Sequence, residues 1–169
     1  MSHPLYQASI PVFTQMLKSM QVILQKAEQH ALAKNIDAQV FLQARIAPDM
    51  FPLIRQVQIA ADFAKGVSAR LAEVDMPTFE DSEVSFADLH ERINKTLAFI
   101  ETLTAEQFVG SEGREVILRP GTPKEKRMDG QTYLLHYGLP QFFFHITTNY
   151  AILRNLGVEI GKKDYMGSY

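Results

Sequence analysis

The sequence predicts an all-α protein, a four-helix bundle with a small β-hairpin before its last helix. Apolar residues recur at spacings of three and four in separate segments, which is typical of helices that bury one face. One short stretch before the last of these segments breaks that period and combines β-branched residues with turn residues. The length of 169 residues suits one domain, and we expect it to span residues 1–169 without an internal boundary.

The first helical segment is predicted over residues 9–33. Ser9 is a favourable N-cap, and Pro11 is tolerated in a first turn, where backbone amides lack intrahelical partners. We expect residues 34–37 to break the helix and residues 38–46 to form a short helical piece outside the bundle. The apolar stripe of the segment is Phe13, Met16, Leu17, Met20, Leu24, Ala27 and Ala31.

The second helical segment follows a run of turn residues. We expect Asp49 to cap it and Pro52 to lie in its first turn. Gly66 lies inside the pattern, where it costs about 1 kcal/mol relative to alanine. A seam with heptad-like spacing runs through Met50, Ile54, Val57, Ala61, Ala64, Ser68 and Leu71. A more polar stripe beside it contains Arg55, Gln58, Asp62 and Lys65.

An acidic connection, residues 73–83, leads to the third helical segment. Ser85 and Asp88 resemble a capping box in which aspartate replaces the usual glutamate. Thr104 and Gln107 form a second capping signature, which predicts a short further turn of helix. The core face of this segment is Phe86, Leu89, Ile93, Leu97, Ile100 and Leu103.

A β-hairpin and a fourth helix complete the predicted fold. The β-branched residues 115–119 precede the turn residues 120–123 and a charged run, which predicts an exposed hairpin. The last helix is predicted from about Gly138 to Gly157, a favourable C-cap, and the tail from Val158 should cover the bundle surface. Its expected core stripe is Leu139, Phe143, Ile146, Tyr150 and Leu153, beside a second stripe of Phe142, His145, Asn149, Ile152 and Leu156.

Composition argues against several classes of function. Cysteine is absent, which removes disulfides, thiolate nucleophiles and cysteine-ligated metal clusters. The net charge of −2 lacks the positive excess of a nucleic-acid binder, so we expect no nucleic-acid partner. We also expect no membrane partner, because no apolar run is long enough to cross a bilayer and no helix has a basic face. The N-terminal residues lack a secretory pattern, and we expect a cytoplasmic protein.

His145 is the main candidate for a functional side chain. It lies mid-helix among the phenylalanines 142–144, where burial requires a hydrogen-bond partner or a metal. One interpretation is a neutral core histidine bonded to a neighbour such as Tyr150 or a side chain of the second helix. The other interpretation is an interior site, because bundles build ligand and metal sites from facing helices.

Other polar residues are candidates for the same pocket. Asn149 lies one turn after His145 on the same face, but asparagine is a poor ligand for zinc or nickel. Asp62 forms either a surface ion pair with Lys65 or part of a polar patch that faces His145 across the bundle. The remaining candidates are Gln56 and Gln58, of which at least one should face another helix, and His136, which precedes the last helix.

Several functional patterns are missing from the sequence. It contains no glycine-rich phosphate loop, no GxSxG nucleophile elbow and no HExxH motif. Among the other histidines, His3 lies in an N-terminal segment that we expect to fray. No motif therefore identifies a reaction.

Two stretches of the sequence resemble a known family. The first is residues 47–58, which continue through Asp62, Lys65 and Arg70. The second is Phe142-Phe143-Phe144-His145, followed by Tyr150-Ala151-Ile152-Leu153-Arg154, Ile160-Gly161-Lys162 and Asp164-Tyr165. Together they resemble an uncharacterised bacterial group, known as a domain of unknown function, within the DinB/YfiT-like superfamily. The likeness runs nearly from end to end.

The resemblance implies an up-down-down-up four-helix bundle, and we expect a homodimer. In typical members of the superfamily a histidine on the second helix and a His-x-x-x-His pair on the fourth bind a divalent metal, here zinc or nickel. Characterised relatives are thiol-dependent transferases and isomerases. His145 matches the first histidine of the pair, whereas Asn149 stands at the second position. The region of the remaining ligand, residues 54–57, offers Gln56 instead of histidine.

These observations leave three hypotheses open. The first is a DinB-like protein with a degenerate metal site, which binds a small molecule in a polar pocket around His145 or acts as a dimeric accessory protein. The second is a metal-dependent transferase or hydrolase in which His145 is joined by Asp62 or Gln58 in a rearranged ligand set. The third is a purely structural or interaction protein that assembles through its hairpin and tail.

Overall fold

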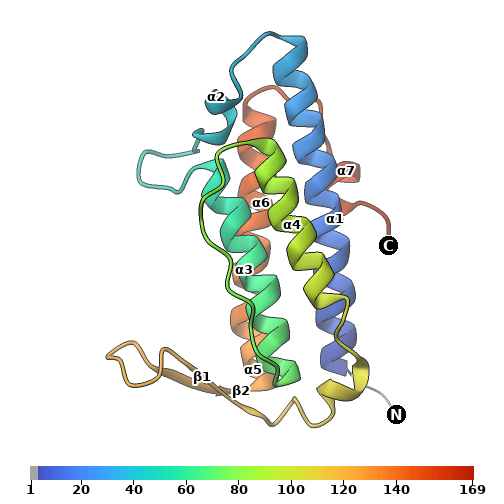
Figure 1. The fold of residues 1–169 in the computed structure, drawn as a ribbon, viewed down its shortest axis with the longest axis vertical. Coiled ribbons are helices and arrows are strands. Elements are labelled where there is room, and N and C mark those ends of the chain that lie inside the picture. Colours follow the sequence, from blue (N-terminus) through green and yellow to red (C-terminus); the bar gives the residue numbers. More distant parts are fainter. Residues whose placement is uncertain (1–3) are drawn as a thin grey trace.

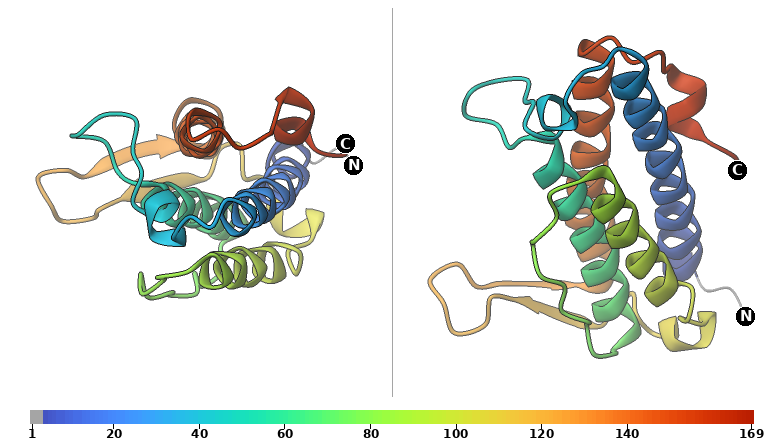
Figure 2. Two further views of the ribbon diagram at one scale, coloured as in Figure 1. Left: turned by 90° about the horizontal axis from the view of Figure 1, so that it is seen from above. Right: turned by 45° about the horizontal axis from the view of Figure 1, so that its top comes forward.

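The computed structural model describes residues 4–169 and confirms the predicted fold class (Figure 1). The helix α1 (Pro4–Ala33) runs up the molecule, α3 (Leu53–Ala72) and α4 (Phe86–Ile100) both run down, and α6 (Leu139–Asn155) runs up again. From above, α1 and α3 lie between α4 on one side and α6 on the other (Figure 2). The expectation for His3 falls outside the described residues.

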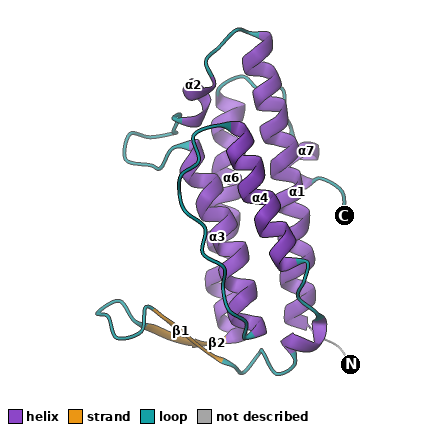
Figure 3. Ribbon diagram, viewed as in Figure 1, coloured by secondary structure: helices purple, strands orange, loops and turns teal. Residues whose placement is uncertain are grey.

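Shorter elements connect and cover the bundle (Figure 3). The antiparallel hairpin projects from its lower end, and its strands pair Glu115 with Asp129 and Leu118 with Lys126. The predicted hairpin and the predicted helical turn after Thr104 are confirmed. These elements are α2 (Ala38–Leu42), η1 (Ala105–Phe108), β1 (Glu115–Leu118), β2 (Lys126–Asp129), α5 (Gly130–Thr132), η2 (Tyr133–Gly138) and α7 (Lys162–Met166).

Two predicted helix starts are wrong. The first helix is already helical at Pro4, so Ser9 lies inside it and its hydroxyl donates to the carbonyl of Leu5 at 2.5 Å. Serine can bond to the preceding helical turn as readily as it can cap a helix, and the sequence does not separate these roles. Asp49 does not cap α3, which begins after Pro52 without a side-chain cap. The predicted core faces of α1 and α4 are buried throughout.

The last helix, α6, begins at Leu139 as predicted, but further helical structure that was not predicted precedes it. Helical structure runs without a break from Gly130, where the carboxylate of Asp129 accepts a hydrogen bond from the amide of Thr132 at 2.7 Å. Pro140, which was used as the start signal, lies in the first turn of α6 and follows a wider, π-helical turn, η2. Proline lacks an amide hydrogen and its ring collides with the carbonyl one turn earlier, and a π-helical turn relieves both problems within a continuous helix.

The predicted core stripe of the last helix is right only in part, since Ile146 and Leu153 are buried. Phe142 and Asn149 of the adjacent stripe are buried, whereas Phe143 and Tyr150 of the predicted stripe are only half-buried. The prediction chose the stripe with more apolar residues. The adjacent stripe is the more deeply buried of the two, although it contains the polar residues His145 and Asn149. The tail does cover the surface, since α7 packs against α1 and Tyr165 packs edge-on against Tyr150.

The acidic connection covers the polar stripe of α3, in which Gln58 and Lys65 are buried and Arg55 and Asp62 are half-buried. It runs back along α3 from its lower to its upper end (Figure 1), which allows α3 and α4 to be parallel. The Arg92 side chain, 1% exposed, lies 2.9 Å from both Asp62 and Glu83 and 3.1 Å from Asp81. The predicted pair of Asp62 with Lys65 forms at 3.1 Å, but the lysine is buried instead of lying at the surface.

Replacing Arg92 by methionine should therefore destabilise the protein strongly. The change leaves Glu83, whose side chain is 8% exposed, without its cation, so we expect the free energy of unfolding to fall by about 3 kcal/mol. The exposed Lys95 pairs with Glu91 on the same helix, and Lys95→Met should cost less than about 1 kcal/mol. Urea denaturation of both variants measures the difference. Equal losses would show that Arg92 does not hold the connection in place.

Candidate functional site

His145 is bound to α3 through an amide. Its Nδ1 lies 2.7 Å from Oε1 of Gln56. The Nε2 of Gln56 donates to the carbonyl of Phe51 at 3.0 Å, which turns Oε1 toward the imidazole. Because an amide oxygen only accepts, Nδ1 carries the hydrogen and Nε2 carries the lone pair. The sequence left two hydrogen-bond partners open for His145, namely Tyr150 and a side chain of the second helix. The structure shows the second of these, Gln56 on α3, whereas Tyr150 packs against Tyr165.

The surroundings of His145 keep it neutral. Burial, and to a smaller degree the charge of Arg55, lowers the pKa of His145 from 6.5 to about 4. The imidazole stacks on Phe63, with ring centroids 6.0 Å apart and planes inclined by 17°, and meets Phe144 edge-on at 5.2 Å. At neutral pH His145 is therefore an uncharged side chain held in one tautomer.

Asn149 brings a second polar group into the interior. The residue is 1% exposed, and neither its amide oxygen nor its amide nitrogen has a hydrogen-bond partner within residues 4–169. A buried polar atom without a partner costs about 1–3 kcal/mol. The turn of α6 that carries His145 and Asn149 is therefore a polar position in an otherwise apolar core.

The residues around His145 do not fit the three-histidine metal site of the superfamily. Within residues 4–169, no three His, Cys, Asp or Glu side chains lie close enough together to bind a metal. Asp62 is bound by Arg92 and Lys65. Gln58 accepts from Arg55 at 2.7 Å and donates to Glu83 at 2.6 Å, and His136 is exposed on η2.

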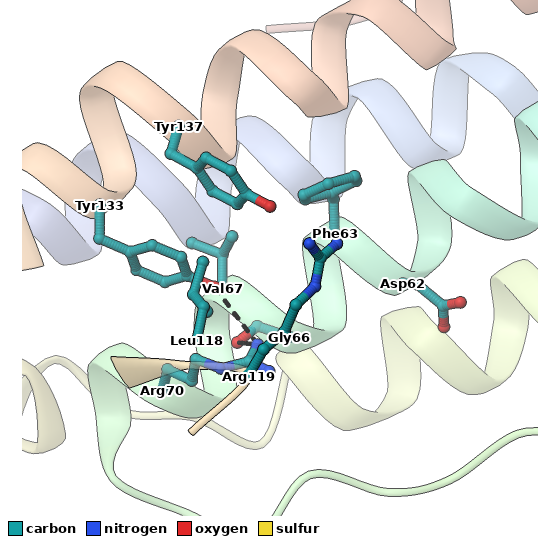
Figure 4. A pocket seen from close by; sticks show the side chains of 9 residues that line it. All are labelled: Asp62, Phe63, Gly66, Val67, Arg70, Leu118, Arg119, Tyr133 and Tyr137. Atoms are coloured by element: carbon teal, nitrogen blue, oxygen red, sulfur yellow. Dashed lines mark hydrogen bonds between the residues drawn. The ribbon is translucent and has the colours of Figure 1, made fainter. Parts of the chain in front are cut away.

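A cleft of about 190 Å³ lies next to this polar turn (Figure 4). Three parts of the chain form it: the middle of α3, the end of the hairpin strand β1, and η2. Its lining is both aromatic and polar. The residues that line it are Asp62, Phe63, Gly66, Val67, Arg70, Leu118, Arg119, Tyr133 and Tyr137.

Gly66 makes room for Arg70 on the floor of the cleft. A Cβ atom at position 66 would lie 2.8 Å from Nη1 of Arg70. Without it, Nη1 folds back and donates to the carbonyl of Gly66 at 2.9 Å and to the hydroxyl of Tyr133 at 3.3 Å (Figure 4). The glycine, which is unfavourable inside a helix, thus leaves space for the guanidinium group, and the two hydrogen bonds hold it there.

Arg119 reaches the cleft because the strand ends there. Successive side chains of an extended strand point to opposite faces, yet Leu118 and Arg119 both line the cleft. Arg119 has the left-handed backbone conformation, with φ at 52°, at the start of the hairpin turn. This conformation is unfavourable for a residue with a side chain, and it breaks the alternation so that the guanidinium turns toward Phe63 (Figure 4).

The wider turn η2 supplies the tyrosines. Tyr133 and Tyr137 stack with centroids 5.9 Å apart and planes inclined by 21°. Gly138 brings η2 close to α3, since a Cβ atom there would lie 2.7 Å from Val67. π-Helical turns occur frequently at functional sites, because they displace side chains from regular helical positions.

Phe63 separates the cleft from His145. Its ring stacks on the imidazole and also meets Tyr137, with centroids 6.0 Å apart and planes inclined by 61°. Reasoning from sequence named His145, Asn149, Gln56 and Asp62 as candidates, and of these Asp62 lines the cleft. It did not name Arg70, Arg119 or the tyrosines of η2 as candidates. Arg70 could have been found, because a glycine one helical turn earlier, Gly66, leaves space for its side chain. No local feature of the sequence indicated Arg119.

Comparisons with known proteins place these observations in a family context. A family model described as "Domain of unknown function (DUF1993)" matches residues 5–166. The structure is similar to a crystal structure of a DinB family member protein from Shewanella denitrificans, with a TM-score of 0.92 and 40% sequence identity. That match covers 98% of this chain and 93% of the other. The comparison with curated proteins gave no match.

The low pKa of His145 makes stability depend on pH. The unfolded chain, with a histidine pKa of 6.5, binds more protons than the folded protein between pH 6.5 and about 4. The stability that neutral His145 contributes is therefore present above pH 6.5 and is lost as the pH falls toward 4.

Between pH 7.5 and 5.0 we expect the wild type to lose about 2 kcal/mol more stability than His145→Gln, measured by urea denaturation. His90→Gln, a change on α4 that leaves His145 in place, should keep the wild-type dependence. A pH dependence that survives in His145→Gln would show that another group is responsible.

Proposed function

The chain belongs to the DUF1993 family, and from this premise we propose that it is a small-molecule-binding protein with a DinB-like fold and a degenerate metal site. The proposed binding site is the cleft between α3, the hairpin and η2. The observation that carries the proposal is the convergence of aromatic and polar side chains from these separate elements on one hollow (Figure 4).

The cleft has the composition of a ligand site. Such sites combine apolar and aromatic walls with a few polar groups that orient the ligand. Phe63, Val67 and Leu118 supply the apolar surface, while Arg70 and Tyr133 supply oriented donors. His145 supports this wall from behind, because its bond to Gln56 holds the imidazole on which Phe63 stacks.

The charges around α3 favour ligand binding over the metal-dependent transferase or hydrolase. A rearranged metal site needs an anionic ligand beside His145. Asp62 was the candidate for this role, but Arg92 and Lys65 hold its carboxylate at 2.9 and 3.1 Å. Homodimer formation stays a prediction from the family resemblance.

Binding of zinc or nickel should not depend on His145. We expect the protein, purified without chelator and then incubated with zinc or nickel, to retain the same amount of metal as His145→Ala. The reason is that the amides of Gln56 and Asn149 are poor ligands for these metals. Elemental analysis after desalting measures the retained metal. One equivalent that disappears in His145→Ala would favour the metal-dependent enzyme instead.

A thermal-shift screen tests the cleft itself. A library of neutral, cationic and anionic small molecules should contain compounds that raise Tm by about 3–6 °C at ten times Kd. The shift should disappear in Tyr137→Ala, which removes one wall of the cleft. It should persist in Gln141→Ala, a change in a neighbouring surface hollow that shares only Tyr137 with the cleft. If no compound shifts the wild type, the proposed function is rejected.

A further inference from the structure

Cations without a carboxylate partner gather around the cleft. Within the described part of the chain, neither Arg70 nor Arg119, which both line it, forms an ion pair. Lys126, on the neighbouring strand β2, also has no ion pair among these residues, and its Nζ lies 5.7 Å from the ring centroid of Tyr137. By contrast, Arg114 and Arg127, farther from the cleft, are paired with glutamates.

The acidic residue of the lining does not neutralise these cations. Asp62 lies at one end of the cleft, and its carboxylate is turned away from the tyrosines (Figure 4). It is held by Arg92 and Lys65 in the layer beneath the acidic connection. The cleft therefore keeps the positive charge of its arginines.

The polar groups of the cleft are arranged as donors. The hydroxyl of Tyr133 accepts a hydrogen bond from Arg70, which leaves its own hydrogen available for another acceptor. Burial raises the pKa of Tyr133, so the phenol keeps that hydrogen at neutral pH. Arg119 adds an exposed guanidinium at the mouth. A site rich in donors and positive charge selects a carboxylate or a phosphate.

The rest of the cleft fits a flat apolar body. Phe63 and Tyr137 present aromatic rings, and Val67 and Leu118 supply aliphatic surface. The volume of about 190 Å³ is smaller than the pockets that hold drug-sized molecules, so the body is limited to about one ring.

We propose that the ligand of this cleft is a small aromatic anion, a single ring that carries a carboxylate or a phosphate. The anion is bound by Arg119, Arg70 and the hydroxyl of Tyr133, and the ring lies against Phe63 and Tyr137. This inference rests on the proposed function and makes its substrate class specific.

Calorimetric titration with matched probes tests the charge requirement. Benzoate and phenyl phosphate carry the anion on one ring, benzamide is the neutral analogue of benzoate, and benzamidine is the cationic one. We expect at least one of the anions to bind about ten-fold more tightly than benzamide, and benzamidine to bind no better than benzamide. Inorganic phosphate alone should bind more weakly than phenyl phosphate, because it lacks the ring.

Variants of the hairpin test the assignment to the cleft. Arg119→Gln should weaken binding of the tighter anion by about ten-fold, and Arg119→Lys should weaken it less. Lys124→Gln makes the same change of charge at an exposed position in the hairpin turn outside the cleft lining, and should change affinity by less than about two-fold. Both Arg119 variants leave the buried core untouched, so the folded state should be retained.

Distinct outcomes would overturn the inference and the proposed function. Benzamide binding as tightly as the anions, or a screen that yields only neutral or cationic ligands, would overturn the anion while the binding function stands. Equal losses in Arg119→Gln and Lys124→Gln would show general surface attraction instead of a site. The absence of any ligand, from these probes and from the screen, would reject the proposed function itself.

Discussion

The buried guanidinium of Arg92 is the constraint on which the topology depends. Helices α3 and α4 run in the same direction, so the chain must travel back along the bundle between them. Arg92 binds that returning segment through Asp81, Glu83 and the carbonyl of Glu80. A buried cation demands such partners, because an unpaired charge in the interior is strongly destabilising. The same cluster engages Asp62, so Arg70 and Arg119, which line the cleft with it, have no ion pair among the described residues.

The cleft depends on close approach of the backbone at Gly66 and Gly138. At these positions a Cβ atom would meet Arg70 and Val67, respectively. Gly66 lets the side chain of Arg70 fold over its own helix, and Gly138 lets η2 approach α3. The cleft is therefore a product of small residues in helices, where glycine is locally unfavourable and persists for a tertiary reason.

The fold was predictable because burial of apolar stripes is a repeated, local signal. The stripes of α1 and α4 and the hairpin followed from spacing and turn chemistry alone. Ser9 and Asp49 misled the prediction of helix starts because short polar side chains are compatible with several local structures. The candidate site could be predicted from the sequence only in part. His145 was recognisable because it is a polar residue in an apolar run. Arg70, Arg119 and Tyr133 are distant in sequence, and only the folded chain brings them together. The charge complementarity between the acidic connection and Arg92 was present in the sequence, but no spacing rule assigns such pairs.

The two walls of the cleft differ in how much they contribute to stability, because one belongs to the helices and the other to the hairpin. Phe63, Arg70 and the tyrosines belong to helices that also maintain the core, so changes there carry a cost in stability. Leu118 and Arg119 come from a two-stranded ribbon that projects from the bundle. Exposed residues of such a ribbon, such as Arg119, can be exchanged with little effect on the helices, whereas Val116 and Leu118 are buried in the core. Substitutions at the exposed end of the ribbon can therefore reshape the mouth of the cleft, while the helices that form its opposite wall keep their packing.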